Sequence, residues 1–193
     1  MTPLIPSFFC KKGYDEMKVF VIAGKSGSGK GEVAKFINEY YIYKLQKNVV
    51  TSYSKYLKLF AKEMTDWDGI SEQKPRDFLQ SFGTKIRNYD NKFFTKRMIE
   101  DIELYQLEGI DNIIIGDARM PDEIDEIRNN YDDVYAIYVE NQFGQSKLTI
   151  EQQAHITETA LEGYNDFDYV LSNDNNLENL KDKVFKFLEG IEK

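Results

Sequence analysis

A glycine-rich segment that ends in a lysine, Gly24-Lys25-Ser26-Gly27-Ser28-Gly29-Lys30, has the residue types and spacing of a phosphate-binding loop. An apolar, β-branched run precedes it and apolar residues at helical spacing follow it, which predicts a strand, a turn and a helix. Glycines permit positive φ values and close backbone approach, so successive N–H groups can turn inward. The helix N-terminus and the lysine add positive charge, and the segment therefore predicts a nest for nucleotide phosphates.

The residue after the lysine departs from this pattern. A serine or threonine hydroxyl usually contacts Mg²⁺ there, and this chain has Gly31. A chance glycine-rich turn is the alternative, but the flanking strand and helix favour nucleotide binding, with the metal held by water or another side chain. We expect ATP to contact Gly24, Ser26, Gly27, Ser28, Gly29, Lys30, Gly31 and Glu32.

An acid and a base follow the triple isoleucine of a second apolar run, in the sequence Gly116-Asp117-Ala118-Arg119. Ligands of α/β sheets bind at the carboxyl ends of strands, so these residues should lie beside the phosphate loop. Asp117 could hold Mg²⁺ through water, and Arg119 could form a bidentate contact with a phosphate. The alternatives are a surface ion pair, or Asp117 as the cap of a helix that begins at Pro121.

Size and composition are those of a globular protein with one domain, or one domain with inserted flaps. The chain has 193 residues, of which 41% are hydrophobic and 30% charged, and its net charge of −8 argues against nucleic-acid binding. The lone cysteine, Cys10, excludes an internal disulfide and fits a cytoplasmic location. No apolar run is long enough to span a membrane, and the first nine residues make a poor signal peptide.

The pattern along the chain alternates between strands and helices. Strands are expected over residues 19–23, 48–53, 112–116, 134–139 and 167–171. Helices are expected after the loop, over 55–64, at least twice within 70–107, from Pro121, and over 177–191. This alternation predicts a doubly wound parallel α/β sheet with helices on both faces. Residues 1–16 should form an irregular extension.

From Met17 onward the chain resembles the deoxynucleoside monophosphate kinases of phages and bacteria, within the P-loop nucleoside monophosphate kinase group. The glycine-rich segment is similar to that family's phosphate loop, which often has Asp rather than Ser or Thr after the lysine. Four later segments resemble its S-x-(A/S)-x-x-L-K, R-x-x-L-Q-x-x-G-T-x-x-R, D-x-R-F-P-N-E and H-x-S-E elements, in this order: 52–64, 75–87, 116–123 and 154–174. Their common order and spacing carry the resemblance.

The resemblance implies ATP-dependent phosphoryl transfer to a nucleoside or deoxynucleoside monophosphate, with ATP and Mg²⁺ as cofactors. It implies one P-loop kinase domain over residues 17–193, with an acceptor-binding flap at about 54–97 and a lid at about 141–162. The implied catalytic residues are Lys30, Asp117 and Arg119. The implied acceptor-binding residues are Lys58, Arg76, Arg87, Asp117, Arg119 and Glu123, and the implied lid residues are Lys147, His155 and Glu158.

Two departures keep other functions open. The lid contains no arginine, and Lys147 is its only lysine, whereas kinases of this kind commonly close an arginine over the phosphates. Gly31 and the lid without arginine together favour one alternative, a protein that binds nucleotides but does not catalyse phosphoryl transfer. A kinase of another small phosphorylated acceptor, such as phosphomevalonate, is the other. Related kinases include dimers, so a homodimer is compatible with the resemblance.

Overall fold

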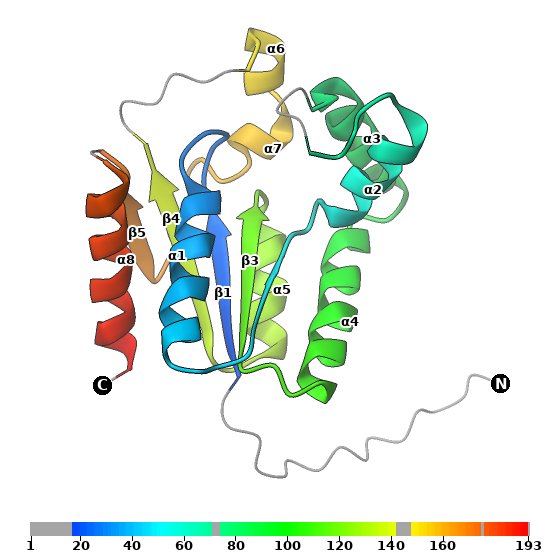
Figure 1. Ribbon diagram of the computed structural model, residues 1–193. Coiled ribbons are helices and arrows are strands. Elements are labelled where there is room, and N and C mark those ends of the chain that lie inside the picture. Colours follow the sequence, from blue (N-terminus) through cyan, green and yellow to red (C-terminus); the bar gives the residue numbers. More distant parts are fainter. Residues whose placement is uncertain (1–16, 71–73, 142–147, 175, 193) are drawn as a thin grey trace, which may run out of the picture.

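One parallel sheet organises the computed structural model, which describes residues 17–70, 74–141, 148–174 and 176–192. Its strand order is β2-β3-β1-β4-β5, and each neighbouring pair is parallel (Figure 1). The strands are β1 (Lys18–Ala23), β2 (Asn48–Thr51), β3 (Asn112–Ala118), β4 (Val134–Glu140) and β5 (Tyr169–Ser172). The chain runs from β1 to the edge strand β2, returns to β3 and then crosses β1 to reach β4. The strand order therefore reverses beside the central strand β1, and its carboxyl end is a point where ligands of such sheets bind.

Helices cover both faces of this sheet, which confirms the predicted doubly wound fold. One face packs against α1 (Lys30–Tyr43) and α8 (Leu177–Ile191), and the other packs against α4 (Phe93–Leu107) and α5 (Pro121–Asn130) (Figure 1). Four further helices lie beyond the carboxyl ends of the strands (Figure 1). They are α2 (Lys55–Met64), α3 (Arg76–Tyr89), α6 (Ile150–Gln153) and α7 (Ile156–Thr159).

The central strand shows why its residues are apolar without interruption. Phe20 and Ile22 join the core beneath α1 and α8, whereas Val19 and Val21 join the core beneath α4 and α5. Successive side chains of a strand point to opposite faces, so a strand covered on both sides needs apolar residues at every position. All four side chains are fully buried.

The predicted helices over 55–64 and 177–191 and the helix from Pro121 are confirmed. All five strands are also found, and their bounds differ from the predicted ones by one or two residues. The second strand ends at Thr51 rather than residue 53, because the N–H of Tyr53 bonds to Asp117 instead of a neighbouring strand. The last strand covers 169–172 rather than 167–171. The predicted extension over residues 1–16 and the predicted lid residue Lys147 lie outside the described residues. Within the described residues, no helix is both long and apolar enough to cross a membrane.

Candidate active site

The phosphate loop joins β1 to α1 in the conformation that its glycines predict. Gly24 and Gly29 have φ values of 142° and 103°, which residues with a side chain rarely adopt. A Cβ atom on Gly24 would lie 2.5 Å from the carbonyl oxygen of Val139, and one on Gly29 would lie 2.5 Å from Nδ2 of Asn173. Glycine is therefore required at both positions by the backbone and by close neighbours. At Gly31 an added Cβ atom would meet nothing within 4 Å.

Lys30 lies at the start of α1 and is folded back under the loop. Its Nζ donates to the carbonyl oxygens of Gly24 at 2.6 Å and Lys25 at 2.7 Å. Burial, and next the positive charge of Arg119, lower the pKa of Lys30 to about 7. A phosphate beside this ammonium would favour its charged form. The buried hydroxyl of Ser28, in the same loop, has no hydrogen-bond partner among the described residues.

Arg119 reaches from the end of β3 toward the loop, as the sequence predicts. Its guanidinium pairs with the carboxylate of Glu158, a residue of α7, and that carboxylate also accepts from the N–H of Ser26 at 2.8 Å. From the other side, Arg76 at the start of α3 places Nη1 3.4 Å from the Ser26 hydroxyl. Three segments that are far apart in the sequence thus meet at Ser26.

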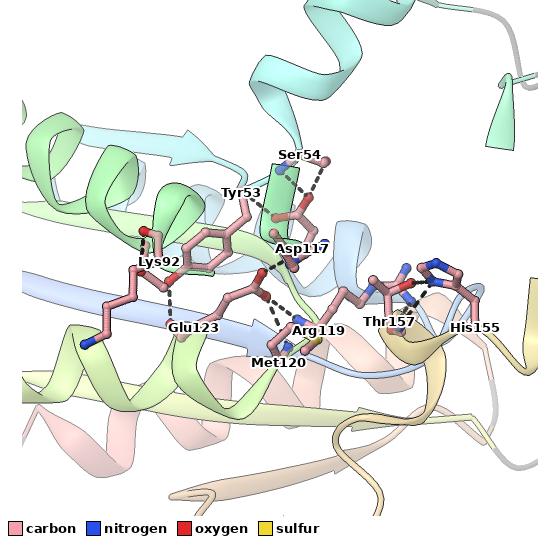
Figure 2. Close-up of polar contacts among 11 residues, drawn as sticks. Tyr53, Ser54, Lys92, Asp117, Arg119, Met120, Glu123, His155 and Thr157 are labelled. Carbon is pink, nitrogen blue, oxygen red and sulfur yellow. Dashed lines mark hydrogen bonds and ion pairs between the residues drawn. The ribbon is translucent and has the colours of Figure 1, made fainter. Parts of the chain in front are cut away.

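Asp117 points to the junction of β2 and α2 (Figure 2). Its carboxylate accepts from the N–H groups of Tyr53 at 2.7 Å and Ser54 at 3.2 Å, and from the Ser54 hydroxyl. Nζ of Lys58 lies 3.9 Å from the same carboxylate. The two oxygens of Asp117 are therefore already occupied by donors that fix the start of the flap.

Glu123 is buried at the base of the site rather than exposed to an acceptor. Its carboxylate accepts from the N–H groups of Arg119 at 2.7 Å and Met120 at 3.2 Å (Figure 2), and it pairs with Arg87 at 3.0 Å. Burial raises the pKa of Glu123 to about 7, against the opposing effects of Arg87 and the backbone donors. The predicted acceptor residues Arg87 and Glu123 thus bind each other, and Glu123 holds the loop that carries Arg119.

The described part of the lid is bound to the flap by polar side chains. Nε2 of His155 lies 3.0 Å from the Thr84 hydroxyl, and Gln152 donates to Asp77 at 2.8 Å. His155 also accepts from the N–H of Thr157 as the cap of α7 (Figure 2). Burial and Arg87 lower its pKa, so the neutral ring is favoured. The family resemblance pointed to His155 and Thr84 separately, but the Gln152–Asp77 contact had no signal in the sequence.

A cavity of about 630 Å³ opens between the phosphate loop, the end of β4 and the lid. Residues of the loop line it together with apolar side chains. The latter include Tyr138, Leu161, Phe167 and Val170. A space of this kind suits the nucleoside part of a ligand whose phosphates lie in the loop.

The described residues show no cluster of metal ligands. No group of three carboxylate, histidine or cysteine side chains comes together in that part of the chain. Gly31 has no hydroxyl, and the oxygens of Asp117 bind Tyr53, Ser54 and Lys58 instead. An ion here would have to arrive with a ligand and keep its waters, as Mg²⁺ does readily.

The fold and the glycine-rich loop are those of the P-loop NTPase class. The crystal structure of TT1252 from Thermus thermophilus aligns with a TM-score of 0.55 and 14% sequence identity, over 91% of this chain and 98% of that one. A sugar kinase from Janibacter sp. HTCC2649 aligns with a TM-score of 0.51 and 14% identity, over 90% and 95%. At such identities the likeness shows the fold alone.

The sequence also matches the family model described as deoxynucleotide monophosphate kinase, over residues 46–184. The chain belongs to this family, which confirms the family resemblance and the predicted reaction class, phosphoryl transfer to a nucleotide monophosphate. The match begins beyond the phosphate loop, so the loop motif and the family match are separate observations. No curated protein matches the chain.

Proposed function

We propose that this enzyme transfers the terminal phosphoryl group of ATP to a deoxynucleoside or nucleoside monophosphate, giving the diphosphate and ADP. Family membership supports the reaction. The observation that carries the assignment of roles is the position of two arginines beside the phosphate loop. Arg76 lies 3.4 Å from the Ser26 hydroxyl, and Arg119 pairs with Glu158, which accepts from the Ser26 N–H. Arginine forks suit phosphate oxygens, and these two come from the start of α3 and the end of β3.

On the donor side, the N–H groups of the loop bind the β-phosphate, and Lys30 moves from the Gly24 and Lys25 carbonyls to bridge the β- and γ-phosphates. An anionic oxygen of the acceptor phosphate attacks the γ-phosphorus. The bond from that phosphorus to the bridging oxygen breaks, and ADP leaves with the electron pair. The acceptor oxygen needs no general base, so positioning and charge neutralisation supply the catalysis.

On the acceptor side, Arg119, Arg76 and Lys58 contact the monophosphate. Glu123 and Asp117 act as positioning residues, because their oxygens are taken up by the Arg119 backbone and by the start of α2. Arg87 contributes charge from its pair with Glu123. The lid closes over both ligands and excludes water, which would otherwise compete as acceptor.

We propose that Mg²⁺ accompanies ATP and contacts the protein through water, since Gly31 has no hydroxyl and the Asp117 carboxylate already accepts from Tyr53 and Ser54. It would neutralise charge on the ATP phosphates. The domain arrangement, with the flap at about 54–97 and the lid at about 141–162, belongs to this proposal, as do a homodimer and a cytoplasmic location.

A coupled assay of ADP release over a panel of monophosphates tests the function. The panel includes deoxynucleoside and ribonucleoside monophosphates and phosphomevalonate. We expect turnover with at least one deoxynucleoside monophosphate and none with phosphomevalonate. Turnover with phosphomevalonate alone would make the enzyme a kinase of another acceptor. ATP binding without turnover on any acceptor would support the non-catalytic alternative.

Arg119→Lys tests the acceptor site within the same assay. Lysine keeps the charge but loses the bidentate fork, so the acceptor KM should rise about tenfold, with little change in ATP affinity. Arg128→Lys is the matched control, because Arg128 forks onto Asp166 and Asp168 at the opposite end of α5. Equal kinetic constants for Arg119→Lys and the parent would mean that Arg119 does not bind the acceptor.

A further inference from the structure

Glu158 of α7 places a carboxylate against the phosphate loop. One oxygen accepts from the N–H of Ser26 at 2.8 Å, and the other pairs with the guanidinium of Arg119. The side chain is only 8% exposed. A backbone N–H of a phosphate loop together with an arginine is an anion site, and in this structure the anion is supplied by the protein itself.

The position of Ser26 indicates which phosphate this anion site would otherwise hold. Ser26 is the third residue of the loop, and its hydroxyl lies 3.4 Å from the guanidinium of Arg76 on the flap. Arg119 and Glu158 both act on the pKa of Lys30, so their charges lie near the same ammonium. The donor loop and the acceptor arginines therefore meet here, where the phosphoryl group in transfer must lie.

We propose that Glu158 is an internal competitor for the terminal phosphate of ATP and that it determines how strongly the enzyme distinguishes ATP from ADP. The inference rests on the proposed function, because it takes the Ser26 N–H, next to the acceptor arginine Arg119, as a donor to the γ-phosphate. Two anions in a poorly solvated site repel each other, so the γ-phosphate and the carboxylate exclude one another. ADP has no γ-phosphate and therefore leaves Glu158 in place.

Displacement of Glu158 moves the lid. The helix that carries it follows His155, which contacts Thr84 of the flap at 3.0 Å. Glu162 of the same lid pairs with Lys25 of the loop at 2.7 Å, and both side chains are 59% exposed. Exposed polar contacts of this kind are individually weak, so they yield when Glu158 leaves. ATP, but not ADP, thus loosens the lid so that the acceptor can enter, and the lid then closes over both ligands.

The test compares Glu158→Gln with the control Glu162→Gln. The control removes one negative charge from the same lid, also next to the phosphate loop, but from a residue that pairs with Lys25. Calorimetry measures the affinity of each variant for the non-hydrolysable analogue adenylyl imidodiphosphate and for ADP. Glu158→Gln should bind the analogue about tenfold more tightly than the parent does. Its affinity for ADP should differ from that of the parent by less than about twofold. In Glu162→Gln the ratio of the two affinities should stay within about twofold of the parent ratio.

Glu158→Asp keeps the charge but withdraws it by one methylene group, so its affinity ratio should shift in the same direction by a smaller factor. This variant decides the matter if Glu158→Gln does not fold. An unchanged ratio in the Glu158 variants, or an equal shift in Glu162→Gln, overturns the proposal. An unchanged ratio in an enzyme that phosphorylates monophosphates overturns this inference alone, whereas a shifted ratio without turnover on any acceptor overturns the proposed function alone.

Discussion

The donor side and the acceptor side of the site hold their charges by different means. On the donor side, the backbone from Gly24 to Gly31 forms the nest, and the Lys30 ammonium donates to two carbonyl oxygens of the same loop. On the acceptor side, Arg119, Asp117 and Glu123 depend on partners in α2, α3 and α7. A change on the donor side should therefore affect chemistry and leave the fold intact, whereas a change on the acceptor side should affect both.

Lys30→Ala should have the largest effect on activity and a small effect on stability. Loss of the ammonium beside the transferred phosphate should lower kcat/KM about 10³-fold. Burial already lowers the pKa of Lys30 to about 7, so the charged form is not a stabilising one, and the melting temperature should stay within about 4 °C of the parent.

Steady-state kinetics and thermal unfolding measure these two quantities. Lys35→Ala is the control, because Lys35 is also on α1 but its side chain is 70% exposed. Full turnover in Lys30→Ala would contradict the assignment of the phosphate loop. A large loss of stability would contradict the distinction between the donor side and the acceptor side.

Asp117→Asn should lower both activity and stability. The amide group of asparagine keeps one acceptor oxygen but turns its NH2 group toward the N–H of either Tyr53 or Ser54, so the start of the flap would lose one of its two backbone anchors. We expect a loss of about 1–3 kcal/mol in the free energy of unfolding and about 10²-fold in kcat/KM. Asp101→Asn is the control, because Asp101 holds α2 through Lys55, outside the site.

A magnesium titration separates anchoring from metal binding. If Asp117 acts through the flap, the parent and Asp117→Asn half-saturate at the same Mg²⁺ concentration. A higher requirement in the variant would support the water-mediated contact that the sequence suggested and would place Asp117 beside the ion.

The same contrast explains what the sequence could predict. The phosphate loop, its strand and its helix are contiguous, so glycine spacing and apolar periodicity indicate them directly. Many partners in the site are distant in the sequence. Glu158 binds Ser26 and Arg119, which are 132 and 39 residues away. Asp117 binds the N–H of Tyr53, 64 residues away, and Glu123 pairs with Arg87, 36 residues away. No local pattern encodes such pairs. The family resemblance identified these residues but not what each one binds.

Glu123→Gln should change the pH dependence of stability more than activity. The pKa of Glu123 is raised to about 7 by burial, so the unfolded chain ionises first as pH rises from the ordinary carboxyl range. Deprotonation then favours unfolding, and the parent loses stability between about pH 4.5 and pH 7 through this group. Glu123→Gln lacks this carboxyl group, so its free energy of unfolding should fall less than that of the parent over the same pH range.

Urea unfolding at pH 5 and pH 7.5 measures the difference in the free energy of unfolding between parent and variant. Glu126→Gln is the control, because Glu126 lies on the same helix and pairs at the surface with Lys92. A parallel pH dependence in Glu123→Gln and the parent would mean that the Arg87 pair keeps Glu123 ionised throughout.

Gly31→Ser should have the smallest effect, because it adds the expected hydroxyl to a position with room for it. A Cβ atom at Gly31 meets nothing within 4 Å, and serine is a better helix residue than glycine by several tenths of a kcal/mol. We expect equal or slightly higher stability, and kcat within about twofold of the parent, since Mg²⁺ accepts a hydroxyl or a water at little difference. A lower magnesium requirement in the variant would mean that the new hydroxyl reaches the ion. A loss of activity well beyond twofold would show instead that the ATP phosphates approach the Gly31 backbone too closely for any side chain, and the donor side would then depend on more than its backbone N–H groups and Lys30.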